Sequence, residues 1–252
     1  MDLQLEIAAP KATTAYAGYT LFTGSLAKLG FNGKTIINTL NQYSFCMAES
    51  DPEFKQALQQ SDILLPDGVA IVAAAKLATG NPIRKISGWD LHGHLLTRLN
   101  KQGGRCFYLG SSAHTLQKIQ RQLSLDFPNI KAGFYSPPFK QEFSAEDNER
   151  MIEAVNNFKP DVLFIGMTAP KQEKWATKHQ HQLNASIICT IGAVFDFYAG
   201  TVKRPSKFWI ILGLEWFGRL LNEPKRLWKR YLYYGPVFLF LMIKYRLHWQ
   251  HN

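Results

Sequence analysis

The sequence predicts an α/β fold, a Rossmann-like and largely parallel sheet flanked by helices, with a helical appendage at the C-terminus. Short apolar segments alternate with segments of helical length between residues 34 and 200. Turn-forming residues such as glycine, serine and aspartate follow most of the apolar segments, as at the ends of strands. Beyond about residue 203 the strand pattern stops, and apolar residues recur at helical spacing.

In the first half of the chain, the pattern predicts two strands and the helices that follow them. The strand TIINTLN (35–41) leads into a helix that extends to about Gln60. The strand DILLPDG (62–68) leads into the small-residue helix VAIVAAAKLA (69–78). A further helix is predicted from Asp90 to Lys101, with Asp90 as its N-cap.

The second half alternates more regularly. Strands are predicted at 105–110, 130–135, 161–166 and 185–192, and helices at 111–127, 144–159 and 170–183. The helix at 144 has an acidic first turn, which suits its dipole, and the helix at 170 has a proline at its start. Strands that alternate with helices predict right-handed crossovers and a sheet buried on both faces.

The basic charge is concentrated in one segment. The formal net charge is +10, and residues 201–252 contribute +8 of it, with ten Lys or Arg against Glu215 and Glu223. Such a field favours phosphate, anionic lipid or nucleic acid. The chain therefore divides into a predicted α/β catalytic body, 1–200, and a basic helical appendage, 201–252.

The three cysteines and the N-terminus indicate the compartment. Cys46, Cys106 and Cys189 are odd in number and far apart, and two of them lie in apolar segments, which is typical of reduced core thiols in the cytosol. The first residues lack the charged start and apolar core of a signal peptide. Residues 1–33 support no interpretation of their role.

Several loops follow predicted strands, where parallel sheets bind their ligands. Asp67 ends an early apolar strand, and burial there raises a carboxyl pKa toward the range of a general base; the alternative is an ordinary Pro-Asp-Gly turn. The loops beginning at Gly110-Ser111 and at Gly166, which extends to Lys171, offer backbone N–H groups for a diphosphate. The alternative for each is simple helix capping.

Three signals are absent from the sequence. It contains no Gly-x-Gly-x-x-Gly and no Walker motif, which argues against dinucleotide enzymes and P-loop NTPases. It has no Asp-x-Asp pair, so no site for the usual divalent cation of a nucleotide diphosphate is predicted, and no cofactor is expected. The histidine pairs His92/His94 and His179/His181 diverge on a helix, so we expect them to be solvated or locally satisfied.

A set of motifs in fixed order then suggests a family. They are NTLN (38–41), LLPDGVAIV, SGWDL, YLGS, DVLFIGMTAPKQE, GAVFDFYAGTVKRPSKFW and LGLEWFGRLLNEPKRLWKR. Between about Lys34 and Tyr231, the chain resembles the WecG/TagA/CpsF family of bacterial glycosyltransferases, family 26. The resemblance implies an inverting, metal-independent enzyme. It would move a sugar from a UDP-sugar to a polyprenyl-diphosphate-linked saccharide at the cytoplasmic face of the membrane.

The resemblance also assigns site residues. The proposed base of the family corresponds to Asp67, and its T-x-N motif, near the acceptor or donor sugar, corresponds to Thr39 and Asn41. The glutamine of its PKQE motif corresponds to Gln172. The appendage arginines that meet the diphosphate correspond to Arg219, Arg226 and the pair Lys229/Arg230. This chain has Lys85 where the family usually has arginine, and lysine keeps the charge but loses the bidentate fork. The segment Gly192–Phe197 also differs from the Gly-Thr version of some members.

The C-terminal segment is too short for a membrane span. Residues 231–243 are interrupted by Gly235-Pro236, whereas a bilayer needs about 20 apolar residues. An interfacial helix on the inner face of the cell membrane is predicted, and a helix packed on the body is the alternative. Two other functions stay open at this stage. One is a nucleic-acid-binding module built on the aromatic residues of the tail, although no known motif is present. The other is a non-catalytic membrane-surface scaffold on the same fold.

Overall fold

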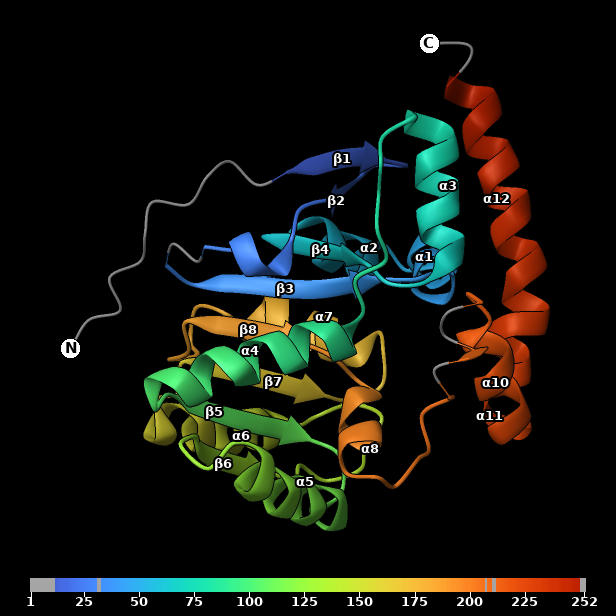
Figure 1. Ribbon diagram of the computed structural model, residues 1–252. Helices are drawn as coiled ribbons and strands as arrows, with labels where there is room; N and C mark the ends of the chain where they lie inside the picture. Colours follow the sequence, from blue (N-terminus) through green and yellow to red (C-terminus); the bar gives the residue numbers. More distant parts are fainter. Residues whose placement is uncertain (1–11, 31–32, 207, 210–211, 250–252) are drawn as a thin grey trace.

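The computed structural model describes residues 12–30, 33–206, 208–209 and 212–249. Within these ranges the strands form one eight-stranded sheet in the order β1-β2-β4-β3-β8-β7-β5-β6, antiparallel between β1 and β2 and parallel elsewhere. The strands are β1 (Thr13–Tyr16), β2 (Tyr19–Phe22), β3 (Thr35–Leu40), β4 (Ile63–Pro66), β5 (Arg105–Gly110), β6 (Lys131–Tyr135), β7 (Val162–Gly166) and β8 (Ile187–Thr190). The predicted α/β fold is confirmed (Figure 1).

The helices occupy the predicted connections. In the body they are η1 (Leu26–Lys28), α1 (Gln42–Ser50), α2 (Pro52–Gln59), α3 (Val69–Thr79), α4 (Gly88–Gln102), α5 (Ala113–Asp126), α6 (Ala145–Phe158), α7 (Lys171–His179) and α8 (Val194–Tyr198). Two boundaries differ from the prediction. The helix predicted to extend to Gln60 divides at Asp51, whose side chain caps α2 ahead of a proline at N1. Asp90 is not an N-cap: Ser87 caps α4, and Asp90 completes the capping box at N3.

A hairpin extends the sheet at its edge, where the sequence supported no interpretation. Strands β1 and β2 are joined by Ala17 and Gly18, which both have positive φ (49° and 81°). Two left-handed residues are the signature of a type I′ hairpin turn, which is normally made by Asn-Gly or Gly-Gly. Because Ala17 is a poor candidate for this conformation, the pattern does not reveal the hairpin. Leu21 of β2 then pairs in parallel with Leu64 of β4.

Helices cover both faces of the sheet (Figure 1). One core cluster lies between the strands and α4, α5 and α8, and a second lies between the strands and α6 and α7. The three cysteines are free and buried, and burial raises the pKa of each thiol, to about 12 for Cys46. The prediction of reduced core thiols is therefore confirmed.

The chain after the body is helical in the described ranges. Its elements are α10 (Glu215–Asn222), α11 (Pro224–Trp228), η2 (Lys229–Tyr233) and α12 (Tyr234–Trp249). A third core cluster joins α12 to α1, α3 and the hairpin. Phe238 is 2% exposed and meets the ring of Phe45 at 5.5 Å between centroids, and the hydroxyl of Tyr245 donates to Glu49 at 2.7 Å. One face of α12 therefore packs on the body.

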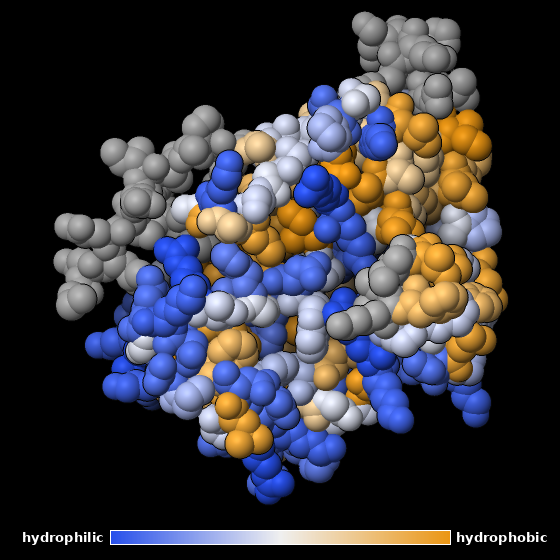
Figure 2. Space-filling view, viewed as in Figure 1, coloured by the Kyte–Doolittle hydropathy of each residue, from blue (hydrophilic) through white to orange (hydrophobic). Residues whose placement is uncertain are grey.

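The opposite face of α12 remains exposed. Leu239, Phe240 and Ile243 are each 60% exposed or more, and Leu77 of α3 is 67% exposed. Figure 2 shows hydrophobic atoms gathered over α3, α12 and α10. No helix within the described residues is long and apolar enough to cross a bilayer. The sequence offered two alternatives for the tail, a helix packed on the body and an interfacial helix. The inner face of α12 packs on the body, and its outer face is a candidate interfacial surface.

Candidate active site

A cleft of about 2200 Å³ opens where the parallel strands end. Its walls include residues at or just after the carboxyl ends of β3, β4, β5, β6, β7 and β8. The other wall comes from the appendage, with α10, α11 and η2 beside this edge of the sheet (Figure 1). In doubly wound folds this edge is where ligands bind. The cleft therefore has walls from both the segment before residue 200 and the segment after it.

Asp67 lies at the centre of the charged groups in the cleft. Its backbone N–H donates to the carbonyl of Leu40 at 2.8 Å, which fixes the end of β4 against β3. Gly68 follows with φ of +115°, a conformation that turns the chain into α3 and that other residues rarely adopt. Burial raises the pKa of the Asp67 carboxyl above its ordinary value. The Pro-Asp-Gly segment thus forms a turn, and its aspartate has a raised pKa.

Four charged side chains act on Asp67. Positive Lys85 lowers its pKa and negative Glu215 raises it, while Arg230 and Arg219 lower it. These neighbours come from the body and from the appendage alike. A carboxyl group held between opposing charges in a cleft is typical of catalytic sites.

Glu215 is a site residue that sequence reasoning missed. Its Oε2 lies 2.5 Å from Lys85 Nζ, and its Oε1 lies 3.6 Å from Arg204 Nε. The guanidinium of Arg204 in turn lies 4.9 Å from the ring centre of Trp89. Glu215 opens α10 inside the LGLEW motif, so its position in that motif was the available signal. The structure directs Lys85 toward Glu215, which links the appendage to the body beside Asp67.

Arg219 and Arg230 carry unsatisfied charge. Arg219 Nε and Nη2 and Arg230 Nε are buried and have no hydrogen-bond partner within the described chain. Their guanidinium groups lie 5.1 Å from the ring centres of Phe197 and Tyr43 respectively. Burial lowers the pKa of Arg230, and the positive charge of Arg219 lowers it further. Buried cations without partners are costly, so this pair is suited to an anionic ligand.

Arg226 and Lys229 also line the cleft but are exposed. Arg226 Nη2 lies 2.6 Å from Glu223 Oε2 one turn earlier. The structure therefore separates the predicted cations into a buried pair, Arg219 and Arg230, and an exposed pair at the edge.

Thr39 and Asn41 lie beside Asp67 in the wall of the cleft. Thr39 is on β3 opposite Leu65 of β4. Asn41 is the N-cap of α1, and its Oδ1 accepts from the N–H groups of Tyr43 and Ser44, both at 3.1 Å. Capping occupies the carboxamide oxygen of Asn41, so its amide nitrogen is the group left for a ligand.

The two predicted phosphate loops use their backbone N–H groups internally. Ser111 N–H donates to the carbonyl of Gly166, and Met167 N–H donates to Oε1 of Gln172. A Cβ on Gly110 would lie 2.5 Å from the carbonyl oxygen of Gly166, so Gly110 allows close strand packing and does not line the cleft. These two amides are therefore occupied within the protein, and Ser112 is the N-cap of α5, as the capping alternative expects. The diphosphate role of the loops stays a prediction.

Gln172 and its neighbour Glu173 form a buried polar pair. Gln172 Nε2 donates to Glu173 Oε1 at 2.8 Å. Burial raises the pKa of Glu173 to about 7, and its Oε2 has no partner in the described chain. Together with the Met167 contact, this fixes both ends of the Gln172 amide. Glu173 belongs to the PKQE motif, but sequence reasoning singled out only its glutamine.

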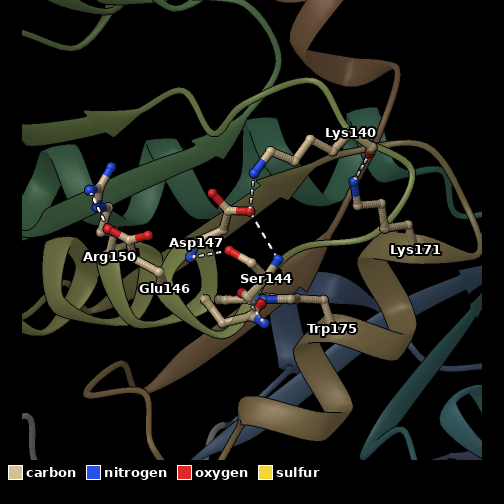
Figure 3. A network of polar contacts seen from close by, with 8 residues as sticks. Lys140, Ser144, Glu146, Asp147, Arg150, Lys171 and Trp175 are labelled. Atoms are coloured by element: carbon tan, nitrogen blue, oxygen red, sulfur yellow. Dashed lines mark hydrogen bonds and ion pairs between the residues drawn. The ribbon is translucent and has the colours of Figure 1, made fainter.

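Lys171 lines the cleft and reaches the loop that follows β6 (Figure 3). Its Nζ donates to the carbonyl of Lys140 and lies 3.5 Å from the ring centre of Phe143. Lys140 Nζ lies 2.7 Å from Asp147 Oδ2, and Trp175 Nε1 donates to Asn148 at 2.8 Å, which joins this loop to α6 and α7. Lys171 thus stabilises one wall of the cleft, and its contact with a ligand stays a prediction.

The histidines behave as predicted in one pair and differently in the other. His92 is buried, its Nε2 lies 2.7 Å from the Tyr108 hydroxyl, and burial lowers its pKa to about 3. His179 is buried too, but its Nδ1 has no partner within the described residues. Across those same residues, no three His, Cys, Asp or Glu side chains gather closely enough to hold a metal ion.

The chain is similar to known proteins over most of its length. Residues 19–252 match the model of the glycosyl transferase WecG/TagA/CpsF family. A protein of Bacillus subtilis (strain 168) is 31% identical over 197 residues, which is 78% of this chain and 75% of that protein. A protein of Bacillus spizizenii is 31% identical over 80% of this chain and 76% of its own length. One from Staphylococcus aureus (strain MW2) is 26% identical over 82% and 79%. All three are named N-acetylglucosaminyldiphosphoundecaprenol N-acetyl-beta-D-mannosaminyltransferase.

Proposed function

The chain belongs to the WecG/TagA/CpsF family and is a glycosyltransferase, and we propose that it moves a sugar from a UDP-sugar to a polyprenyl-diphosphate-linked saccharide. The names of the relatives favour N-acetylmannosamine as the sugar and a diphosphoundecaprenol-linked N-acetylglucosamine as the acceptor. The broader class also includes the uronic acid of N-acetylmannosamine and hexoses. The product would serve bacterial surface polysaccharide or teichoic acid synthesis.

The observation that supports this proposal is Asp67, a carboxyl group with a raised pKa that interacts electrostatically with Arg219 and Arg230, whose buried nitrogens lack partners in the described chain. As the general base, Asp67 takes the proton of an acceptor hydroxyl while that oxygen attacks C1 of the donor sugar. The bond from C1 to the UDP oxygen breaks on the opposite side, and the configuration at C1 is inverted. Thr39 and Asn41, beside the base, orient the sugars.

The departing UDP carries the electrons of the broken bond, so its diphosphate gains negative charge. Arg219 and Arg230 meet this charge in our proposal, because their buried nitrogens lack partners and cationic groups aimed at developing charge lower a barrier strongly. Arg226 and Lys229 attract the donor at the edge of the cleft. With this cationic set we propose transfer without a divalent metal, so chelation by EDTA should leave the rate unchanged. An EDTA-sensitive rate that Mg²⁺ restores would refute this part.

We propose that the enzyme works as a peripheral protein on the inner face of the cell membrane. The apolar residues exposed on α3 and α12 and the cations of the appendage support this placement, because apolar side chains with flanking lysine and arginine suit an anionic bilayer surface. The nucleic-acid alternative is weaker, since Tyr234 packs edge-on against Tyr43 at 5.0 Å and Tyr231 packs on Trp216 at 5.7 Å. Those rings are engaged with the protein and poorly placed to stack on bases.

The test is a transfer assay with a panel of UDP-sugars and a synthetic lipid-diphosphate acceptor. Mass spectrometry of the product identifies the sugar, and UDP release measures turnover. We expect an adduct with the mass of N-acetylhexosamine. Absence of product and of UDP with every donor would favour the scaffold alternative over catalysis.

A further inference from the structure

The cleft continues past Asp67 into an apolar groove between α3 and α12. One side carries Val69, Ala73 and Leu77, and the other carries Gly235, Leu239 and Met242, all within the lining of the same cleft. Residues spaced by four along α3, and by four and three along α12, share one helix face. We call this feature the α3–α12 groove.

Core packing holds the two helices in place, and Phe238 and Met242 contribute both to this packing and to the lining of the cleft. Ile71, Ala74 and Ala75 of α3 and Phe238 of α12 are buried in the shared core cluster. In contrast, Val69, Leu77 and Leu239 are 43%, 67% and 60% exposed. The groove is therefore open, and Figure 2 shows its rims as part of the hydrophobic surface over α3 and α12. Contiguous exposed apolar surface of this kind marks a binding site.

The inner end of the groove lies at the reaction centre. Val69 is two residues from Asp67, and Gly213, just ahead of α10, lies close enough that a Cβ on it would be 3.4 Å from Val69. From Val69 to Leu77 the helix α3 extends about 12 Å, at 1.5 Å a residue. A ligand with its polar end at Asp67 would thus place a hydrocarbon tail along the apolar residues Val69, Ala73 and Leu77 of α3.

From this continuity we propose that the α3–α12 groove binds the polyprenyl chain of the acceptor. The inference rests on the proposed function, which supplies an acceptor with a saccharide, a diphosphate and a long hydrocarbon chain. The saccharide lies at Asp67, and the chain leaves along Ala73 and Leu77 toward the membrane-facing end of the two helices. Burial of this chain between apolar walls adds affinity in proportion to the area removed from water. The base and the lipid tail are thereby held by consecutive parts of one segment, β4 and α3.

The test fills the groove without touching the polar site. Ala73→Trp places a large side chain in the groove from an exposed position, and Gly235→Leu does so from the opposite wall, where nothing lies within 4 Å of the new Cβ. Ala78→Trp is the matched control, since Ala78 is also exposed on α3 but does not line the cleft. Each variant is assayed in detergent with two acceptors that carry the same saccharide diphosphate, one on an undecaprenyl chain and one on a butyl group.

We expect the ratio of kcat/KM for the undecaprenyl acceptor to that for the butyl acceptor to fall about tenfold in Ala73→Trp and in Gly235→Leu, and to stay at the wild-type value in Ala78→Trp. Equal loss on both acceptors, or an unchanged ratio, would overturn the proposal. Two further outcomes would also refute it. Reduced binding to anionic vesicles with an unchanged ratio of kcat/KM values would indicate that the groove contacts bulk lipid. A change in oligomeric state alone would indicate that the groove binds a second copy of the chain.

A binding measurement separates the failure of this proposal from failure of the proposed function. If the wild-type protein transfers no sugar, undecaprenyl diphosphate is titrated into the wild type and the three variants in detergent. About tenfold weaker binding in the two groove variants than in Ala78→Trp supports the groove independently of turnover. Equal binding in all four proteins would reject it.

Discussion

The contact between Lys85 and Glu215 yields the most quantitative prediction, because it joins the body to the appendage beside Asp67, the proposed general base. The two charges lie 2.5 Å apart, and their side chains are only 25% and 17% exposed. A charge-assisted hydrogen bond of this kind contributes about 1.5–3 kcal/mol. Loss of the pair should therefore reduce the population in which Arg219 and Arg230 face Asp67 by roughly ten- to hundredfold.

A double-mutant cycle measures this coupling. Lys85→Gln, Glu215→Gln and the double variant are compared by kcat/KM with a saturating lipid acceptor. We expect each single change to lower kcat/KM and the second change to add little, with a coupling of about 1.5–3 kcal/mol. The swapped pair, Lys85→Glu with Glu215→Lys, should recover part of the loss. Additive single effects, or unchanged protection of α10 in hydrogen exchange, would refute the view that this pair positions the appendage.

Three further predictions follow from the structure. Glu173→Gln should flatten the pH dependence of stability. Burial raises the pKa of Glu173 from 4.5 to about 7, so the stability that this group contributes is fully present below pH 4.5. About 3 kcal/mol of it is lost as the pH rises to 7, which melting curves of the variant and the wild type at pH 5 and pH 8 would detect. Phe238→Ala should remove about 3–5 kcal/mol from the packing of α12 and make this helix sensitive to limited proteolysis. Phe240 is 67% exposed, so Phe240→Ala should change neither stability nor proteolysis by much. Equal effects of the two variants would contradict the assigned faces of α12. Arg219→Ala should lower turnover by roughly 10²- to 10³-fold. Its binding to vesicles should stay close to that of the control Lys225→Ala, because Lys225 is an exposed cation outside the cleft lining. If Arg219→Ala loses vesicle binding but keeps its turnover, the catalytic role is contradicted.

Much of the fold could be predicted from the sequence because apolar periodicity is a local property. The parallel strands and most helices of the body lie where the alternation places them. The edge hairpin escaped prediction because Ala17 adopts a left-handed conformation that its residue type does not signal. The N-cap of α4 was misassigned since Ser87 and Asp90 form a capping box together, and either could have been read as the first residue.

The site was only partly predictable, because local sequence patterns do not specify contacts between distant segments of the chain. The resemblance brought Asp67, Thr39 and Arg219 into one proposed site, and all three line the same cleft. Nothing local indicates that Glu215 reaches Lys85, 130 residues away. The loops at Gly110 and Gly166 have the composition of phosphate loops, yet Ser111 N–H donates to the carbonyl of Gly166 and Met167 N–H donates to the side chain of Gln172.

The tail shows the same limit. The apolar stripe of residues 231–249 predicts an amphipathic helix, but the sequence cannot specify which face meets the body. Phe238 contacts Phe45 of α1, so that face is buried, and Leu239 and Phe240 are left outward. Of the apolar residues that recur at helical spacing beyond residue 203, Trp216 and Leu220 lie on α10. Residues 210 and 211 and the side chain of Arg246 lie outside the described part of the chain.

The most direct test of the account is the Asp67→Asn variant, measured for UDP-sugar binding and for transfer to the lipid acceptor. A general base contributes about 10²- to 10⁴-fold to a rate, so turnover should fall by that factor. Binding of the UDP-sugar, measured by calorimetry, should be at least as tight as in the wild type, since the change removes a negative charge near the donor diphosphate. Full turnover in Asp67→Asn would contradict the assignment of the base and the mechanism built on it.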